Sequence, residues 1–186
     1  MRSHAVTVAL ARIERGEPGA SEALWDLVYQ DLKQLAAARL ARLGAGQTMQ
    51  ATALVHEVWM RLGGDAPPSF DGRAHFFGAA ANAMRNILVD EARRKARLRR
   101  NRGEAPAPLT ADIAALAADS PVDMLALDEA LTAFAREYAR PAHIVMLRFF
   151  AGLEIARIAE LLGVTTRTVD RDYLFARTWL RRFLSR

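Results

Sequence analysis

The chain has no cysteine among its 186 residues. This absence excludes a disulfide framework, a thiol nucleophile and any metal site built on cysteine, and it fits a reducing compartment. No stretch reaches the roughly 18 consecutive apolar residues that span a membrane. Arg12, Glu14 and Arg15 interrupt the apolar residues near the N-terminus, so no targeting segment is expected there. These absences predict a soluble, cytoplasmic protein without a membrane partner.

The sequence also lacks the residue patterns of a catalytic or cofactor site. Its four histidines are scattered, and no HExxH motif, paired-carboxylate spacing or phosphate-binding glycine loop accompanies them. We therefore expect no enzyme activity, no metal and no cofactor. The histidines are His4, His56, His75 and His143.

Positive charge is in excess, which favours a polyanionic partner. Lys and Arg number 26 against 21 for Asp and Glu, a net charge of +5. Seven of the ten residues 93–102 are Lys or Arg and none is acidic. A charge run can be a solvated face, but like charges at this density repel each other, which makes an anionic partner the better explanation. Nucleic acid is favoured over an anionic membrane surface.

The apolar residues follow the period of an α-helix nearly everywhere, and no stretch alternates as a strand would. The predicted fold class is therefore all-α. Further helices are expected over residues 51–62 and from Arg73 onward. One helix, ending near residues 43–46, buries a face formed by Leu24, Leu27, Val28, Leu32 and Leu35.

A segment with three prolines and few large apolar residues, 103–121, is predicted to be a linker. It divides the chain into two small helical domains, residues 1–102 and 122–186. Ser120 is expected to cap the first helix of the second domain, with Pro121 at its first position.

Residues 153–184 have the pattern of a helix-turn-helix. Gly163 stands where the turn needs a positive φ, Val164 fills the turn, and Thr165 is placed to cap the second helix. One face of that helix is predicted to be buried. The opposite face offers donors and acceptors to base edges in a major groove, with Arg181 and Arg182 near phosphates. It consists of Thr166, Arg167, Asp170, Arg171, Leu174 and Arg177. An ordinary helical hairpin with a solvated charged face is the alternative.

Three segments together, "LVHEVWMRL", "FDGRAHFFGAAANAMRNILVDEARR" and "IAELLGVTTRTVDR", resemble the extracytoplasmic-function (ECF) group of bacterial sigma-70 factors. The resemblance covers nearly all of the chain. It implies that residues 1–102 are sigma region 2, which binds the clamp helices of core RNA polymerase and melts the minus-ten element. It implies that residues 122–186 are region 4, which binds the minus-35 element and the polymerase flap.

The resemblance also assigns site residues. The candidates for polymerase binding are Leu54, Val55, Glu57, Val58, Arg61 and Leu62. Leu54, Val58 and Leu62 recur every four residues, so a core role is the alternative for them. Arg85 and Asn86 match the region that reads a minus-ten base, and Phe76 and Phe77 are expected in the core rather than on melted bases. The candidates for backbone phosphates are Arg93, Arg94, Lys95, Arg97, Arg99 and Arg100.

Two positions depart from the pattern of the family. After "TV" the family usually has Lys or Arg, whereas here Asp170 and Asp172 flank Arg171. Because aspartate repels phosphate, each is expected either to face a cytosine amino group or to pair with a neighbouring Arg, and the target sequence stays open. Before "LVHE" the family carries an acidic cluster that faces the polymerase clamp. Here those four positions are neutral: Gln50, Ala51, Thr52 and Ala53.

The neutral positions suggest control by phosphorylation. A phosphate on Thr52, or on Thr48 one turn earlier, restores about −1.5 to −2 charges near a helix N-terminus. We therefore hypothesise that a Ser/Thr kinase activates the protein. The alternatives are that these threonines cap the helix while apolar contacts compensate, and that an anti-sigma factor exerts the control. The competing function is a dimeric helix-turn-helix regulator that binds duplex DNA without polymerase, but it leaves the first hundred residues without a role.

Overall fold

The protein is described by a computed structural model covering residues 2–41, 49–65, 67–101 and 123–185. Across these ranges the structure consists of helices and contains no strand, so the all-α prediction is confirmed. The elements are α1 (Arg2–Glu14), α2 (Ala20–Ala41), α3 (Ala51–Arg61), α4 (Gly72–Asn101), α5 (Met124–Glu137), α6 (Ala139–Val145), the π-helical turn η2 (Met146–Phe150), α7 (Ile155–Leu162) and α8 (Thr166–Leu184).

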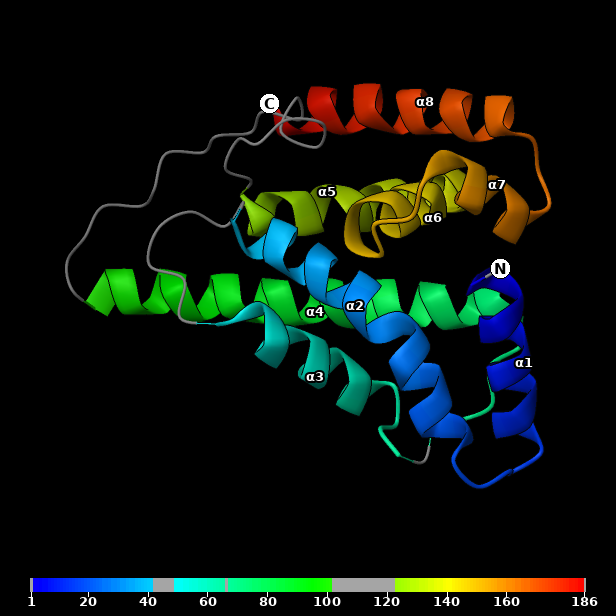
Figure 1. The fold of residues 1–186 in the computed structure, drawn as a ribbon. Helices are drawn as coiled ribbons and strands as arrows, with labels where there is room; N and C mark the ends of the chain where they lie inside the picture. The colour runs from blue at the N-terminus through cyan, green and yellow to red at the C-terminus, as the bar shows by residue number, and fades with distance from the viewer. Residues whose placement is uncertain (1, 42–48, 66, 102–122, 186) are drawn as a thin grey trace.

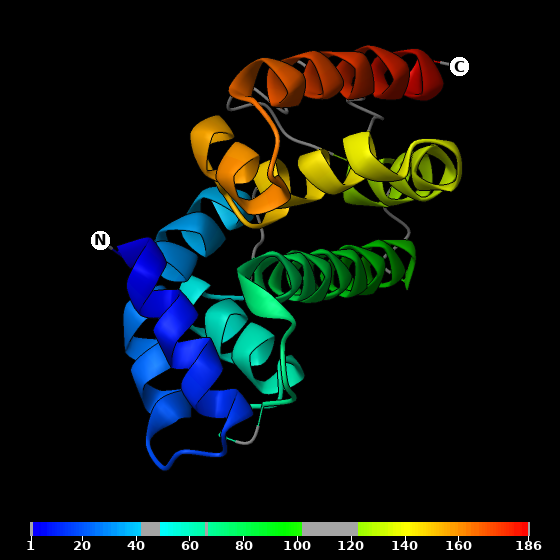
Figure 2. The same ribbon diagram turned by 90° about the vertical axis from the view of Figure 1, so that its right-hand side faces the viewer.

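The helices are stacked in layers (Figures 1 and 2). Helix α8 covers a layer formed by α5, α6 and α7, and α4 runs beneath that layer, with α3 on its other side. Helix α2 crosses α4 diagonally and extends toward the layer of α5 to α7. We call α1 to α4 the N-terminal half and α5 to α8 the C-terminal half. The halves meet where α4 packs against α5 and η2. Helix α4 therefore lies between its own half and the other one.

One continuous apolar core joins the two halves. Phe76 of α4, Phe134 of α5 and Phe150 of η2 are all fully buried within it. Complete burial of such a side chain contributes about 1.5–3 kcal/mol. The expectation that Phe76 belongs to the core is confirmed, and Phe77 packs half-buried beside it.

The predicted apolar face of α2 is also found. Leu24, Val28 and Leu32 are buried, while Leu27 and Leu35 are half-buried. Helix α2 is described as far as Ala41, so its predicted end at residues 43–46 lies outside the described residues. None of the described helices combines the length and apolar character that crossing a membrane requires.

The start of α5 differs from the prediction. Its N-cap is Asp123, not Ser120: the Asp123 carboxylate accepts hydrogen bonds from the amides of Leu125 (2.9 Å) and Ala126 (3.1 Å). A carboxylate satisfies these orphan amides and also faces the positive end of the helix dipole. The predicted linker, 103–121, lies outside the described residues.

The corner between η2 and α7 sits close to α2. Gly152 at this corner has a φ of +64°, and a Cβ at this position would lie 2.6 Å from Cδ1 of Leu35. A glycine is therefore required both by the left-handed backbone and by the close approach of the two halves.

Candidate nucleic-acid interface

Helices α7 and α8 form the predicted helix-turn-helix. Gly163 ends α7 in the left-handed conformation (φ 64°, ψ 32°), and Thr165 caps α8 by accepting a hydrogen bond from the Thr168 amide (3.1 Å). Gly163 tolerates the positive φ because it has no Cβ. The predicted positive φ at Gly163 and the predicted cap by Thr165 are confirmed.

The outer face of α8 presents the residues predicted to contact the minus-35 element. Val169, Ala176 and Leu180 fix the opposite face in the core. Leu174 is 64% exposed, which is unusual for a large apolar side chain and leaves it available to a partner. Arg177 is half-buried, and the other five predicted residues are exposed: Thr166, Arg167, Asp170, Arg171 and Leu174.

Arg177 differs from the other five residues in the burial of its guanidinium group. Its Nε is buried without a hydrogen-bond partner in the described structure. An unsatisfied guanidinium donor is costly. Arg181 and Arg182, near the end of α8, are exposed.

The two aspartates that flank Arg171 have different surroundings. Asp170 is exposed, whereas Asp172 is buried and accepts a hydrogen bond from Nε of Arg140 on α6 (2.7 Å). The other oxygen of Asp172 lies 3.2 Å from Nη2 of Arg171. Asp172 thus ties the recognition helix to α6 and orients Arg171. Pairing with a neighbouring arginine was one of the two expectations for these aspartates, and Asp172 shows it. The link to Arg140 was not predicted, although the spacing of Asp172 from the buried Val169 and Ala176 places it on the inner face.

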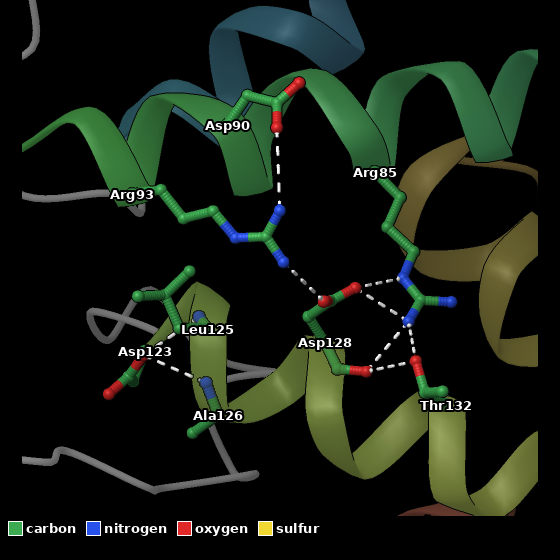
Figure 3. Close-up of polar contacts among 8 residues, drawn as sticks. All are labelled: Arg85, Asp90, Arg93, Asp123, Leu125, Ala126, Asp128 and Thr132. Atoms are coloured by element: carbon green, nitrogen blue, oxygen red, sulfur yellow. Dashed lines mark hydrogen bonds and ion pairs between the residues drawn. The ribbon is translucent and has the colours of Figure 1, made fainter.

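Arg85, predicted to contact the minus-ten element, is bound to the other half of the protein. Its Nε donates to Oδ1 of Asp128 (2.8 Å), and its Nη2 donates to the Asp128 carbonyl (2.8 Å) and to Oγ1 of Thr132 (2.7 Å). Figure 3 shows the Arg85 side chain extending from α4 to these α5 groups. Asn86, the next residue, is exposed.

Arg93 lies on the same side of α4, two turns further along (Figure 3). Its guanidinium is 3.8 Å from Asp90 and 3.8 Å from Oδ2 of Asp128. The two oxygens of Asp128 are therefore divided between Arg85 and Arg93. We call the set Arg85, Arg93, Asp128 and Thr132 the Asp128 contact.

The rest of the basic segment is partly engaged and partly exposed. Arg94 donates two hydrogen bonds to buried Glu91, at 2.9 and 2.7 Å, and these bonds raise the pKa of Arg94. Lys95 is half-buried, and Arg97 and Arg100 are exposed. The side chain of Arg99 lies outside the described residues.

Helix α3 was predicted to bind polymerase, and the structure changes which of its residues can do so. Leu54, Val55, Val58 and Leu62 are buried in the core, with exposed fractions of 4% or less. The prediction that these four contact a partner directly is wrong for this conformation, because helical spacing turns them all inward.

Glu57 and Arg61 lie on the accessible side of α3. Arg61 donates to Glu57 (2.9 Å) and lies 3.5 Å from Asp90 of α4. Two residues that were not predicted lie beside them on the surface, His56 and Met60, and Met60 is 69% exposed. The His56 ring also lies 5.2 Å from the ring of Trp25 on α2.

The N-terminus of α3 lacks both a side-chain cap and an acidic residue. Gln50 occupies the N-cap position without a side-chain hydrogen bond, and the first turn contains no Asp or Glu. The alternative that Thr52 caps this helix is therefore wrong, because Thr52 lies inside the helix. Thr52 is half-buried, and Thr48 lies outside the described residues.

Comparison with known proteins identifies the family. A family model described as "ECF sigma factor" matches residues 3–186. No curated protein and no solved structure matched. Because the family model spans almost the whole chain and both predicted DNA-facing helices, the chain belongs to the ECF sigma factor family, which acts in transcription initiation with core RNA polymerase and promoter DNA as partners.

Proposed function

We propose that this sigma factor binds core RNA polymerase through residues 1–102 and directs it to promoters with both halves. In this assignment residues 1–102 are region 2, 103–121 are a linker and 122–186 are region 4. The observation that carries the proposal is the capped helix-turn-helix, whose outer face leaves five of its six predicted DNA-contacting residues exposed.

The polymerase-binding surface is the outer side of α3. Glu57 and Arg61 remain the candidates for direct contact with the clamp helices, and exposed Met60 supplies an apolar anchor beside them. Leu54, Val55, Val58 and Leu62 support this surface from the core.

Promoter DNA is assigned to α4 and α8. Arg85 and Asn86 are proposed for the minus-ten base, and the arginines that follow for the phosphates of the same element. The phosphate-contacting set is Arg93, Arg94, Lys95 and Arg97. The minus-35 element is assigned to the outer face of α8, where each base-edge contact is worth about 1–3 kcal/mol of discrimination.

A Ser/Thr kinase is proposed to control polymerase binding through Thr52. Thr52 is the second residue of α3, where amides have no helical partner and the dipole favours negative charge. A phosphate brings about −1.5 to −2 charges to a first turn that contains no acid. It thereby supplies the charge that the family carries at these positions. Control by an anti-sigma factor is the competing mechanism.

Core polymerase binding and run-off transcription over a salt series test this function. We expect Thr52→Glu to bind core about three- to tenfold more tightly than wild type, and Thr52→Ala to show no gain. Ala53→Glu adds a charge at the neighbouring exposed position and should give part of the gain. Ala135→Glu on α5 adds the same charge far from α3 and should give none.

Three results would count against the proposal. Full transcription in cells by Thr52→Ala would exclude kinase control through this residue. Tight binding of core by unmodified wild type would show that apolar contacts compensate for the missing acids. Binding of duplex DNA without any binding of core would favour the dimeric regulator instead.

A further inference from the structure

Asp170 and Asp172 both lie on α8, and the structure gives them opposite surroundings. Asp172 is buried and bound to Arg140 and Arg171. Asp170 is exposed, and its carboxylate makes no hydrogen bond or ion pair with any residue that the structure describes. Pairing with an arginine therefore explains Asp172 and does not explain Asp170.

An unpaired carboxylate in the middle of a DNA-facing surface is restricted in what it can meet. Phosphate oxygens repel it, so it must face the base edges in the major groove. There, guanine offers only acceptors, and thymine offers an acceptor and a methyl group. Adenine places an acceptor beside its amino group, whereas cytosine offers its amino group alone. A cytosine is therefore the base that matches the Asp170 carboxylate.

The second unusual residue on this surface is Leu174, one helical turn beyond Asp170. Its side chain is 64% exposed, although large apolar side chains are usually buried. The next residue, Phe175, is 41% exposed, so the two residues form an apolar patch that continues the DNA-facing surface. Helix α8 cannot rotate to cover Leu174, because Val169 and Ala176 hold its opposite face in the core. The apolar group that a major groove displays is the thymine methyl.

The spacing of the two residues limits how far apart their bases lie. Four residues of an α-helix rise about 6 Å, and one base pair of DNA rises about 3.4 Å. A helix that lies along the groove therefore brings Asp170 and Leu174 to base pairs that are one or two steps apart.

We propose that Asp170 and Leu174 determine the specificity for the minus-35 element: the Asp170 carboxylate accepts a hydrogen bond from the amino group of a cytosine, and Leu174 packs on the methyl group of a thymine one or two base pairs away. The inference rests on the proposed role of α8 in binding the minus-35 element, and it names the bases that this role requires. The exposed Arg167 and Arg171 on either side of Asp170 offset its repulsion by the DNA backbone.

The first measurement is a selection. Polymerase complexes assembled from core enzyme and the full chain select from promoters whose minus-35 region is random in sequence. We expect enrichment of a cytosine and a thymine within two base pairs of each other. Asp170→Asn should lower the affinity for the selected promoter about tenfold and should select adenine in place of the cytosine, because an amide pairs with both N6 and N7 of adenine. Glu129→Gln, which removes an exposed charge from α5, should leave the selected sequence unchanged.

The second measurement isolates a single methyl group. The selected thymine is replaced by deoxyuridine, which lacks only the 5-methyl group. We expect the affinity of wild type to fall about fourfold, as the loss of one buried methyl group predicts. Leu174→Ala should bind the thymine promoter more weakly by a similar factor and should not distinguish thymine from deoxyuridine. Val8→Ala, which shortens an exposed apolar side chain on α1, should distinguish them as wild type does.

The outcomes distinguish two failures. Selection of no minus-35 sequence at all would refute the role of α8 in promoter recognition. A selected sequence that lacks the cytosine or the thymine, or that Asp170→Asn leaves unchanged, would overturn the assignment of these bases alone. Equal sensitivity of wild type and Leu174→Ala to deoxyuridine would overturn it as well, because Leu174 would then not touch the methyl group.

Discussion

Helices α4 and α8 are both rich in arginine and both assigned to promoter DNA, yet their surroundings differ. The DNA-facing side of α8 is exposed, with Arg171 70% exposed, whereas Arg85 of α4 is enclosed against α5. The acidic partners of the two arginines are also placed differently. Asp172 lies on the inner face of α8 and orients Arg171 toward the exposed side, whereas Asp128 belongs to α5 and covers Arg85.

The difference shows how one type of residue takes two roles. An arginine at a packed interface needs an acidic partner, because an unpaired buried charge is costly. An arginine on an outer face does not. The face of α8 proposed for the minus-35 element is therefore exposed, whereas Arg85, proposed for the minus-ten element, is engaged by α5.

The largest expected effect concerns α8. Arg171→Ala should weaken promoter binding by the polymerase complex about 10- to 100-fold, because one base-edge contact is worth about 1–3 kcal/mol. Binding is measured with promoters that carry and lack the minus-35 element, and the loss should appear only with the element. Arg136→Ala, an exposed position on α5, is the control. An equal loss in both variants would mean that the outer face of α8 does not read DNA.

A smaller effect is expected at the outer part of α4. Arg97→Ala should lower the slope of log affinity against log salt concentration by about one, since one phosphate contact is lost. The affinity at moderate salt should fall a few-fold and equally for all sequences. The measurement is a salt titration of promoter binding, with Arg136→Ala again as the reference. An unchanged slope would show that exposed Arg97 remains in solvent when DNA binds.

The smallest effect concerns pH and the packing between the halves. His143 on α6 packs against Gly78 of α4, and burial lowers the pKa of His143 below 6.5. In the unfolded chain His143 has its ordinary pKa near 6.5 and binds a proton more tightly than in the folded protein. The free energy of unfolding is therefore unaffected by this group above about pH 6.5 and falls as the pH drops below it. Between pH 7.5 and 5.5 the melting temperature of wild type should fall a few degrees more than that of His143→Gln. If the melting temperatures of wild type and His143→Gln fell equally with pH, the pH response would come from groups other than His143.

Local features of the fold were predictable, and contacts between the halves were not. Gly163 and Thr165 act within a few residues, so their turn and cap follow from the sequence. Ser120 and Pro121 predict a helix start close to the observed one, and only the structure shows that Asp123 is the N-cap. The pairing of Arg85 with Asp128 joins residues 43 positions apart, and no periodicity encodes such a contact.

Helix α3 gives a different lesson. The resemblance to the family marked Leu54 and Val58 as contact residues, while their four-residue spacing marked them as core. Both residues are buried, in agreement with the core role that their spacing indicated. Asp172 is a related case, because its spacing from Val169 and Ala176 places it on the inner face of α8 although it is charged.

The π-helical turn η2 gives the packing of the halves a dependence on temperature. Met146, Leu147, Phe149 and Phe150 are all buried, and η2 packs directly on α4. Apolar contacts of this kind weaken on cooling, because the hydrophobic driving force is largely entropic near room temperature. Cold should therefore loosen the apolar part of the interface and leave the Asp128 contact to hold α4 and α5 together.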